Sequence, residues 1–136
     1  MLHDELLLDQ RGYPQDGDGT HDGCAELSED TSATLYDTAK ERLIKAGVFG
    51  LFDKVISAHM VERGKPYPDV YLYAASALSL KPEECIAVED SPNGVLSAYR
   101  AGCKTVMVPD LTEPDEDLKK LLYGIAHDLT GLKEII

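Results

Sequence analysis

The run Cys85-Ile86-Ala87-Val88-Glu89-Asp90-Ser91-Pro92-Asn93-Gly94 carries the clearest local signals of fold class in the sequence. Its first four residues form a continuous apolar run, which is typical of a strand covered on both faces. Ser91-Pro92 then indicates the start of a helix, because serine caps helices and proline suits their first turn. The stretch therefore predicts a strand that ends at two carboxylates and leads directly into a helix.

The regions on either side repeat this alternation of strand and helix. Helices are expected where apolar residues recur every three or four positions, and strands where short apolar runs stand between turn signals. The pattern predicts an α/β fold with a doubly wound, parallel, Rossmann-like sheet. Helices are expected at 35–46, 69–80, 91–102, 115–123 and 132–136, and strands at 54–57, 85–88, 105–108 and 125–126.

The amino-terminal part of the chain differs from the rest. It is acidic and rich in glycine, with few aliphatic residues that could form a core strand, which favours irregular structure. We therefore divide the sequence into an irregular segment, 1–34, and a single, incomplete α/β core, 35–136. The length of 136 residues fits one domain.

Composition excludes several classes of partner. With 13 basic and 25 acidic residues the formal charge is -12, so a nucleic-acid partner is not expected. No apolar run is long enough to span a membrane, and the start of the chain lacks the features of a secretory signal, so we expect a cytoplasmic protein. The odd number of cysteines, without metal-type spacing, indicates reduced structural thiols.

Three side chains could form a phosphate site at the sheet edge. Glu89 and Asp90 follow a strand directly, at the edge where open α/β sheets bind ligands, and paired carboxylates suit Mg²⁺. The alternative is that both acids are capping or solvent-facing charges. Lys65 lies between Gly64 and Pro66, where its ammonium could bind phosphate, although such a tripeptide also fits an exposed turn.

The segment Gly64–Tyr71, followed by Cys85–Val95 and Ala101-Gly102, closely resembles the third and fourth motifs of haloacid dehalogenase-like hydrolases. The resemblance covers roughly residues 35–110 and is closest to the branch of β-phosphoglucomutase and pseudouridine-5'-phosphatase. It implies that Lys65 steadies the phosphate and the nucleophile, and that Glu89 and Asp90 hold Mg²⁺ directly or through water. Ser91 and Asn93 would border the substrate.

The first motif of that family is an apolar strand ending in Asp-x-Asp-Gly-Thr. Asp16-Gly17-Asp18-Gly19-Thr20 spells this motif. The resemblance then makes Asp16 the nucleophile and Asp18 the acid and base, with both also among the metal ligands. The preceding residues do not read as a strand, because they include glycine and proline. A competing placement ends the strand Leu6-Leu7-Leu8 at Asp9, but it puts Arg11 where the second aspartate belongs.

The second motif supplies a serine or threonine that binds the transferring phosphate at the end of a strand. Ser32 and Thr34 are the candidates, although each could instead be the N-cap of the helix at 35–46. Thr34 follows Thr20 by 34 - 20 = 14 positions. This spacing leaves no room for the helical cap domain that the branch usually inserts between its first two motifs.

Two functional hypotheses follow. The first is a magnesium-dependent phosphoester hydrolase that acts on a small phosphorylated metabolite through an aspartyl-phosphate. The second is a catalytically inactive remnant of the family that serves as a binding or dimerising module, in which a homodimer covers the exposed sheet.

Overall fold

Three short apolar runs form a parallel sheet in the computed structural model, which describes residues 29–136. The strands are β1 (Ile86–Glu89), β2 (Lys104–Met107) and β3 (Gly124–Ile125), hydrogen-bonded in that order. Ile86 lies opposite Lys104 and Val106 opposite Gly124. Because the strands are parallel, their carboxyl ends share one edge of the sheet, as the sequence predicts. The α/β class and the strands near 85–88, 105–108 and 125–126 are confirmed.

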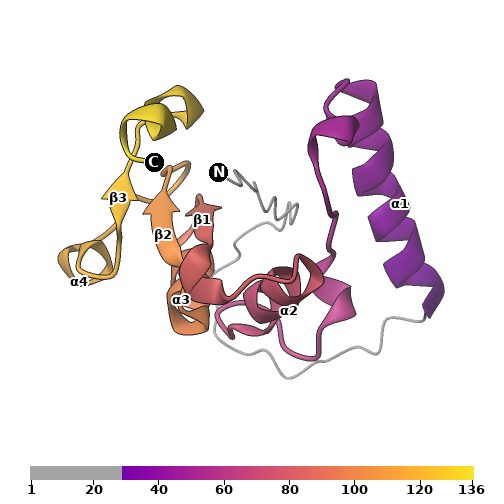
Figure 1. Cartoon of the computed structure of the whole chain (residues 1–136), viewed down its shortest axis with the longest axis horizontal. Coiled ribbons are helices and arrows are strands. Elements are labelled where there is room, and N and C mark those ends of the chain that lie inside the picture. The colour runs from indigo at the N-terminus through magenta and orange to yellow at the C-terminus, as the bar shows by residue number, and fades with distance from the viewer. Residues whose placement is uncertain (1–28) are drawn as a thin grey trace.

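Three of the described helices precede or connect the strands and pack on one face of the sheet (Figure 1). They are α2 (Asp69–Ala77), α3 (Pro92–Ala101) and α4 (Glu116–Lys119). The predicted boundaries of α3 are confirmed by its capping. The Ser91 side chain accepts a hydrogen bond from the amide of Gly94 at 3.2 Å. Gly102 ends the helix in the left-handed conformation, with φ 98°, which glycine adopts without a steric penalty.

Apolar side chains on both faces of the sheet are buried, so the sheet is the middle layer of the core. On the helical side, one cluster joins Tyr71 of α2 to Ala87 and Ala98, and a second joins Val95, Met107 and Leu118. On the opposite side, Val106 packs against residues near the carboxyl end, where a 3-10 helix, η4, spans Leu129–Glu134. The residues buried with Val106 on that side are Ala126 and Leu132.

The amino-terminal helix α1 (Glu29–Lys45) stands on the opposite side of the molecule from the strands (Figure 1). It begins six residues before the predicted start, so the predicted boundary at 34 lies inside the helix. Its apolar periodicity begins only at Leu35, whereas Glu29 and Asp30 favour a helix start through their charge. Two 3-10 turns, η1 (Phe49–Leu51) and η2 (Ala58–Met60), lead from α1 toward α2.

The predicted strand at 54–57 is wrong, since no regular structure is assigned there. A strand needs a hydrogen-bonded neighbour, and the described residues contain only the three strands above. The helix predicted to reach residue 80 ends at Ala77, because Ser79 adopts a positive φ of 58°.

The last two predicted helices are also shorter or different. The helix at 115–123 ends at Lys119, before the Tyr123 amide donates to the Thr105 carbonyl at 2.8 Å alongside β3. The terminal helix at 132–136 is instead the 3-10 helix η4, which begins after Asp128 caps the amides of Thr130 and Gly131.

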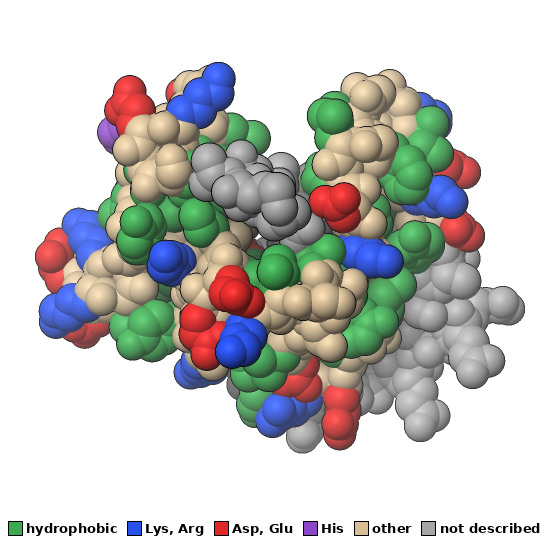
Figure 2. All heavy atoms as spheres, viewed as in Figure 1, with side chains coloured by type: hydrophobic (Ala, Val, Ile, Leu, Met, Phe, Trp, Pro, Cys, Tyr) green, Lys and Arg blue, Asp and Glu red, His purple; other side chains and the backbone are tan. Residues whose placement is uncertain are grey.

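Acidic and basic side chains are interspersed on the face shown in Figure 2. On α4 they pair along the helix, with Lys119 bonded to Glu116 at 2.8 Å and Lys120 to Asp117 at 2.7 Å. Among residues 29–136 there is no helix with the length and apolar character that crossing a membrane requires.

Candidate functional site

Glu89 is the centre of the candidate site and is a buried carboxylate. It is the last residue of β1, and only 5% of its surface is exposed. One of its oxygens, Oε1, accepts hydrogen bonds from the ammonium of Lys65 and from the hydroxyl of Tyr71. Buried charges are stable when they are paired and hydrogen-bonded, so these two donors account for the burial of Glu89.

The first turn of α3 closes over the same carboxylate. A Cβ atom added to Gly94 would overlap the Glu89 carboxyl group, with Oε2 as the nearest atom. Glycine is therefore required by close approach rather than by backbone conformation. The amino-terminal end of a helix also carries a partial positive charge that favours a carboxylate.

Lys65 reaches Glu89 from the loop before α2. Its side chain is 8% exposed, and its ammonium lies 5.4 Å from the centroid of the Tyr71 ring. The loop is closed by an exposed ion pair in which Arg63 donates to both Asp69 oxygens, at 3.1 and 2.9 Å. The hydrogen bond from Arg63, together with its charge, lowers the pKa of Asp69, and the same contacts raise the pKa of Arg63.

Asp90, the next residue after Glu89, is exposed at the carboxyl edge of the sheet. Its neighbour Ser91 uses its hydroxyl oxygen to cap α3, while Asn93 is exposed on the first turn of that helix. The structure thus gives the two adjacent acids different environments. Glu89 is enclosed by donors, whereas Asp90 faces solvent and can contact a solute.

The remaining predicted site residues are not brought to this edge in the part of the chain that is described. Asp16 and Asp18 lie outside the described residues. Ser32 and Thr34 lie within α1. The sequence predicts them at the end of a strand or at the N-cap of the helix, and neither position is observed. Within residues 29–136 there is no group of three or more His, Cys, Asp or Glu side chains that could hold a metal ion.

Tyr71 and Gly94 are the site residues that the sequence did not reveal as such. Tyr71 is expected only to pack, yet its hydroxyl donates to Glu89, and only 2% of the surface of the residue is exposed. Its spacing of three from Ala74, which is also buried, was the available signal that it lies on the inner face of α2. The role of Gly94 depends on contact with another element and has no signal in local sequence.

Comparisons with known proteins identify relatives of this chain. A family model described as haloacid dehalogenase-like hydrolase matches residues 30–102, just over half of the chain. Hexitol phosphatase A of Escherichia coli (strain K12) is 47% identical over 72 residues, which cover 48% of this chain and 33% of that protein. The "Probable pseudouridine-5'-phosphatase" of Drosophila melanogaster is 39% identical over 92 residues, 64% of this chain and 38% of that protein.

Solved structures share the same fold. A "putative beta-phosphoglucomutase" from Thermotoga maritima superposes with a TM-score of 0.62 and 28% identity, over 74% of this chain and 49% of that one. The predicted resemblance to the β-phosphoglucomutase and pseudouridine-5'-phosphatase branch is confirmed. The present chain spans only about a third of the length of the curated relatives it matches, 33% and 38% of the two above.

Proposed function

Because the chain belongs to the haloacid dehalogenase-like hydrolase family, we propose that it acts as a phosphatase on a small phosphorylated metabolite. The observation that carries the proposal is the arrangement at the carboxyl end of β1. There a buried Lys65–Glu89 pair lies beside Asp90, a carboxylate that is open to solvent. Relatives of the chain include hexitol phosphatase A, whose name states a phosphatase activity.

In the proposed reaction, a carboxylate oxygen of Asp16 attacks phosphorus. The new oxygen–phosphorus bond forms as the ester oxygen–phosphorus bond breaks, and Asp18 protonates the departing oxygen. Asp18 then removes a proton from water, which attacks the aspartyl-phosphate, releases inorganic phosphate and restores Asp16. Lys65 contributes positive charge for the phosphate oxygens, and Ser32 or Thr34 is the proposed hydroxyl donor.

Glu89 and Asp90 differ in how well they suit a role as Mg²⁺ ligands. Asp90 is an exposed carboxylate, the kind of oxygen donor that Mg²⁺ prefers, and we propose it as a direct ligand. Glu89 already accepts from Lys65 and Tyr71, so its proposed part is to add negative charge beside the ion. Asp16 and Asp18 are the other proposed ligands. When bound, Mg²⁺ would neutralise charge that develops on the transferring phosphoryl group.

The test is phosphate release from a panel of small phosphomonoesters by the full chain, with Mg²⁺ and with a chelator. We expect turnover with Mg²⁺ and its loss in both Asp16→Asn and Asp90→Asn, while the exposed control Asp53→Asn keeps it. Dependence on Asp90 without dependence on Asp16 would show that the nucleophile is wrongly assigned. Mg²⁺ binding without turnover by the folded chain would overturn the phosphatase proposal and favour the binding-module alternative.

A further inference from the structure

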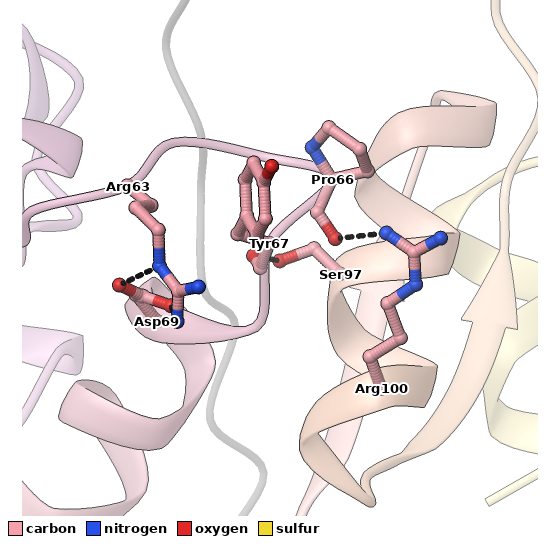
Figure 3. A network of polar contacts seen from close by, with 6 residues as sticks. All are labelled: Arg63, Pro66, Tyr67, Asp69, Ser97 and Arg100. Carbon is pink, nitrogen blue, oxygen red and sulfur yellow. Dashed lines mark hydrogen bonds and ion pairs between the residues drawn. The ribbon is translucent and has the colours of Figure 1, made fainter.

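Side chains of helix α3 donate hydrogen bonds to the backbone of the loop that carries Lys65 (Figure 3). The hydroxyl of Ser97 donates to the Tyr67 carbonyl at 2.6 Å, and the guanidinium of Arg100 donates to the Pro66 carbonyl at 3.0 Å. Ser97 and Arg100 are three residues apart, so they share one face of α3. Their two acceptors belong to the two residues that directly follow Lys65.

The buried Ser97 hydroxyl bonds a specific group outside its own helix. It is fully buried, with 0% of its surface exposed, and sits in the middle of a helix. A serine there commonly bonds a carbonyl of its own helix, one turn back. Instead, this hydroxyl satisfies a carbonyl 30 positions away in sequence. Losing the hydroxyl would leave the partly buried Tyr67 carbonyl without this donor, which is unfavourable in the folded state.

The other side of the loop is fixed as well. Arg63 pairs with Asp69 across the loop, and its guanidinium lies 4.7 Å from the centroid of the Tyr67 ring. Figure 3 shows the Arg63–Asp69 pair on one side of Tyr67 and the contacts from α3 on the other. The main chain next to Lys65 is therefore tied to α3, the helix whose Gly94 also closes over Glu89.

We propose that Ser97 and Arg100 are positioning residues that set the Lys65 ammonium against Glu89. That Lys65 then binds phosphate rests on the proposed function, whereas its position does not. A shift of about 1 Å in a group that contacts a reacting centre can lower a rate by about a hundredfold. We expect Ser97→Ala to lower kcat/KM by roughly ten- to a hundredfold on that basis.

The decisive measurement is the acetylation rate of each lysine in the native full chain, followed by mass spectrometry. Lys65 is nearly buried and should react slowly in the parent, whereas the exposed Lys54 provides an internal reference. We expect Ser97→Ala and Arg100→Met to speed labelling of Lys65 severalfold without changing Lys54. Ser76→Ala, at an exposed serine of α2, is the matched control and should change neither rate.

Two further variants separate positioning from general loss of structure. Arg100 is exposed, so Arg100→Met tests the contact without disturbing the buried core, and Arg100→Lys should restore part of the protection of Lys65. Unchanged Lys65 labelling in both Ser97→Ala and Arg100→Met would overturn the proposal. A different outcome is faster Lys65 labelling in both variants, together with a parent protein that neither binds inorganic phosphate nor hydrolyses phosphomonoesters. That outcome would support the positioning role and overturn the phosphatase function instead.

Discussion

Replacing Gly94 by alanine should destabilise the protein, although alanine is the better helix former. Gly94 lies in the first turn of α3, and a methyl group there would overlap the Glu89 carboxylate. Alanine gains about 1 kcal/mol over glycine inside a helix. Displacing Glu89 would disrupt its buried pair with Lys65, and breaking such a pair typically costs about 3–5 kcal/mol. The free energy of unfolding should therefore fall by about 2–4 kcal/mol.

Urea unfolding of the full chain measures this change through the transition midpoint and slope. The control is Gly50→Ala, because a Cβ atom at Gly50 meets nothing within 4 Å. Its effect should stay within about 0.5 kcal/mol. In a Glu89→Ala background the overlap is gone, so Gly94→Ala should stabilise by up to about 1 kcal/mol. If Gly94→Ala stabilises the parent protein as much as it stabilises the Glu89→Ala variant, the close approach to Glu89 does not explain why glycine occupies position 94.

Tyr71→Phe should lower the free energy of unfolding by about 1.5–3 kcal/mol in urea titrations, because it removes a donor to the charged, buried Glu89. The exposed Tyr73→Phe is its control, and equal effects of the two would contradict the role of the hydroxyl. Burial, with a smaller contribution from Cys85, raises the pKa of the Cys103 thiol to about 12. Iodoacetamide at pH 8 should therefore modify the partly exposed Cys85 before Cys103, as peptide mass spectrometry would show. The ordinary pKa of a thiol is 9.0. The stabilisation that the buried, protonated Cys103 contributes is therefore complete below pH 9 and should decline as the pH rises from 9 toward 12. Cys103→Ala should remove this decline from the pH profile of urea unfolding.

Local signals made α3 and the strands around it predictable. Ser91-Pro92 and Gly102 mark both ends of α3 within a few residues, and the apolar run before Glu89 gives β1. Strand order then brings Glu89 and Asp90 to the ligand-binding edge without any knowledge of tertiary contacts. These parts of the fold depend on information that lies within one helix or one strand.

The failures depended on contacts between distant segments. The run at 54–57 has the residues of a strand but no partner strand among the described residues. Around Glu89, local sequence does not predict the hydroxyl of Tyr71 or the turn at Gly94, which packing from α2 and α3 brings against its carboxylate. Periodicity shows which face of an element is apolar, but it does not show which side chain on a neighbouring element will meet it.

The sheet register has a consequence for how this part of the chain folds. Ile86 pairs with Lys104 and Val106 with Gly124, so each strand joins the next at a separation of 104 - 86 = 18 and 124 - 106 = 18 residues. Loops of equal and modest length carry similar closure entropies, and neither pairing must wait for a distant segment. Proteins whose contacts are local in sequence fold faster than those that depend on remote pairing. The strands β1 to β3 can therefore assemble in succession, each pair serving as the template for the next.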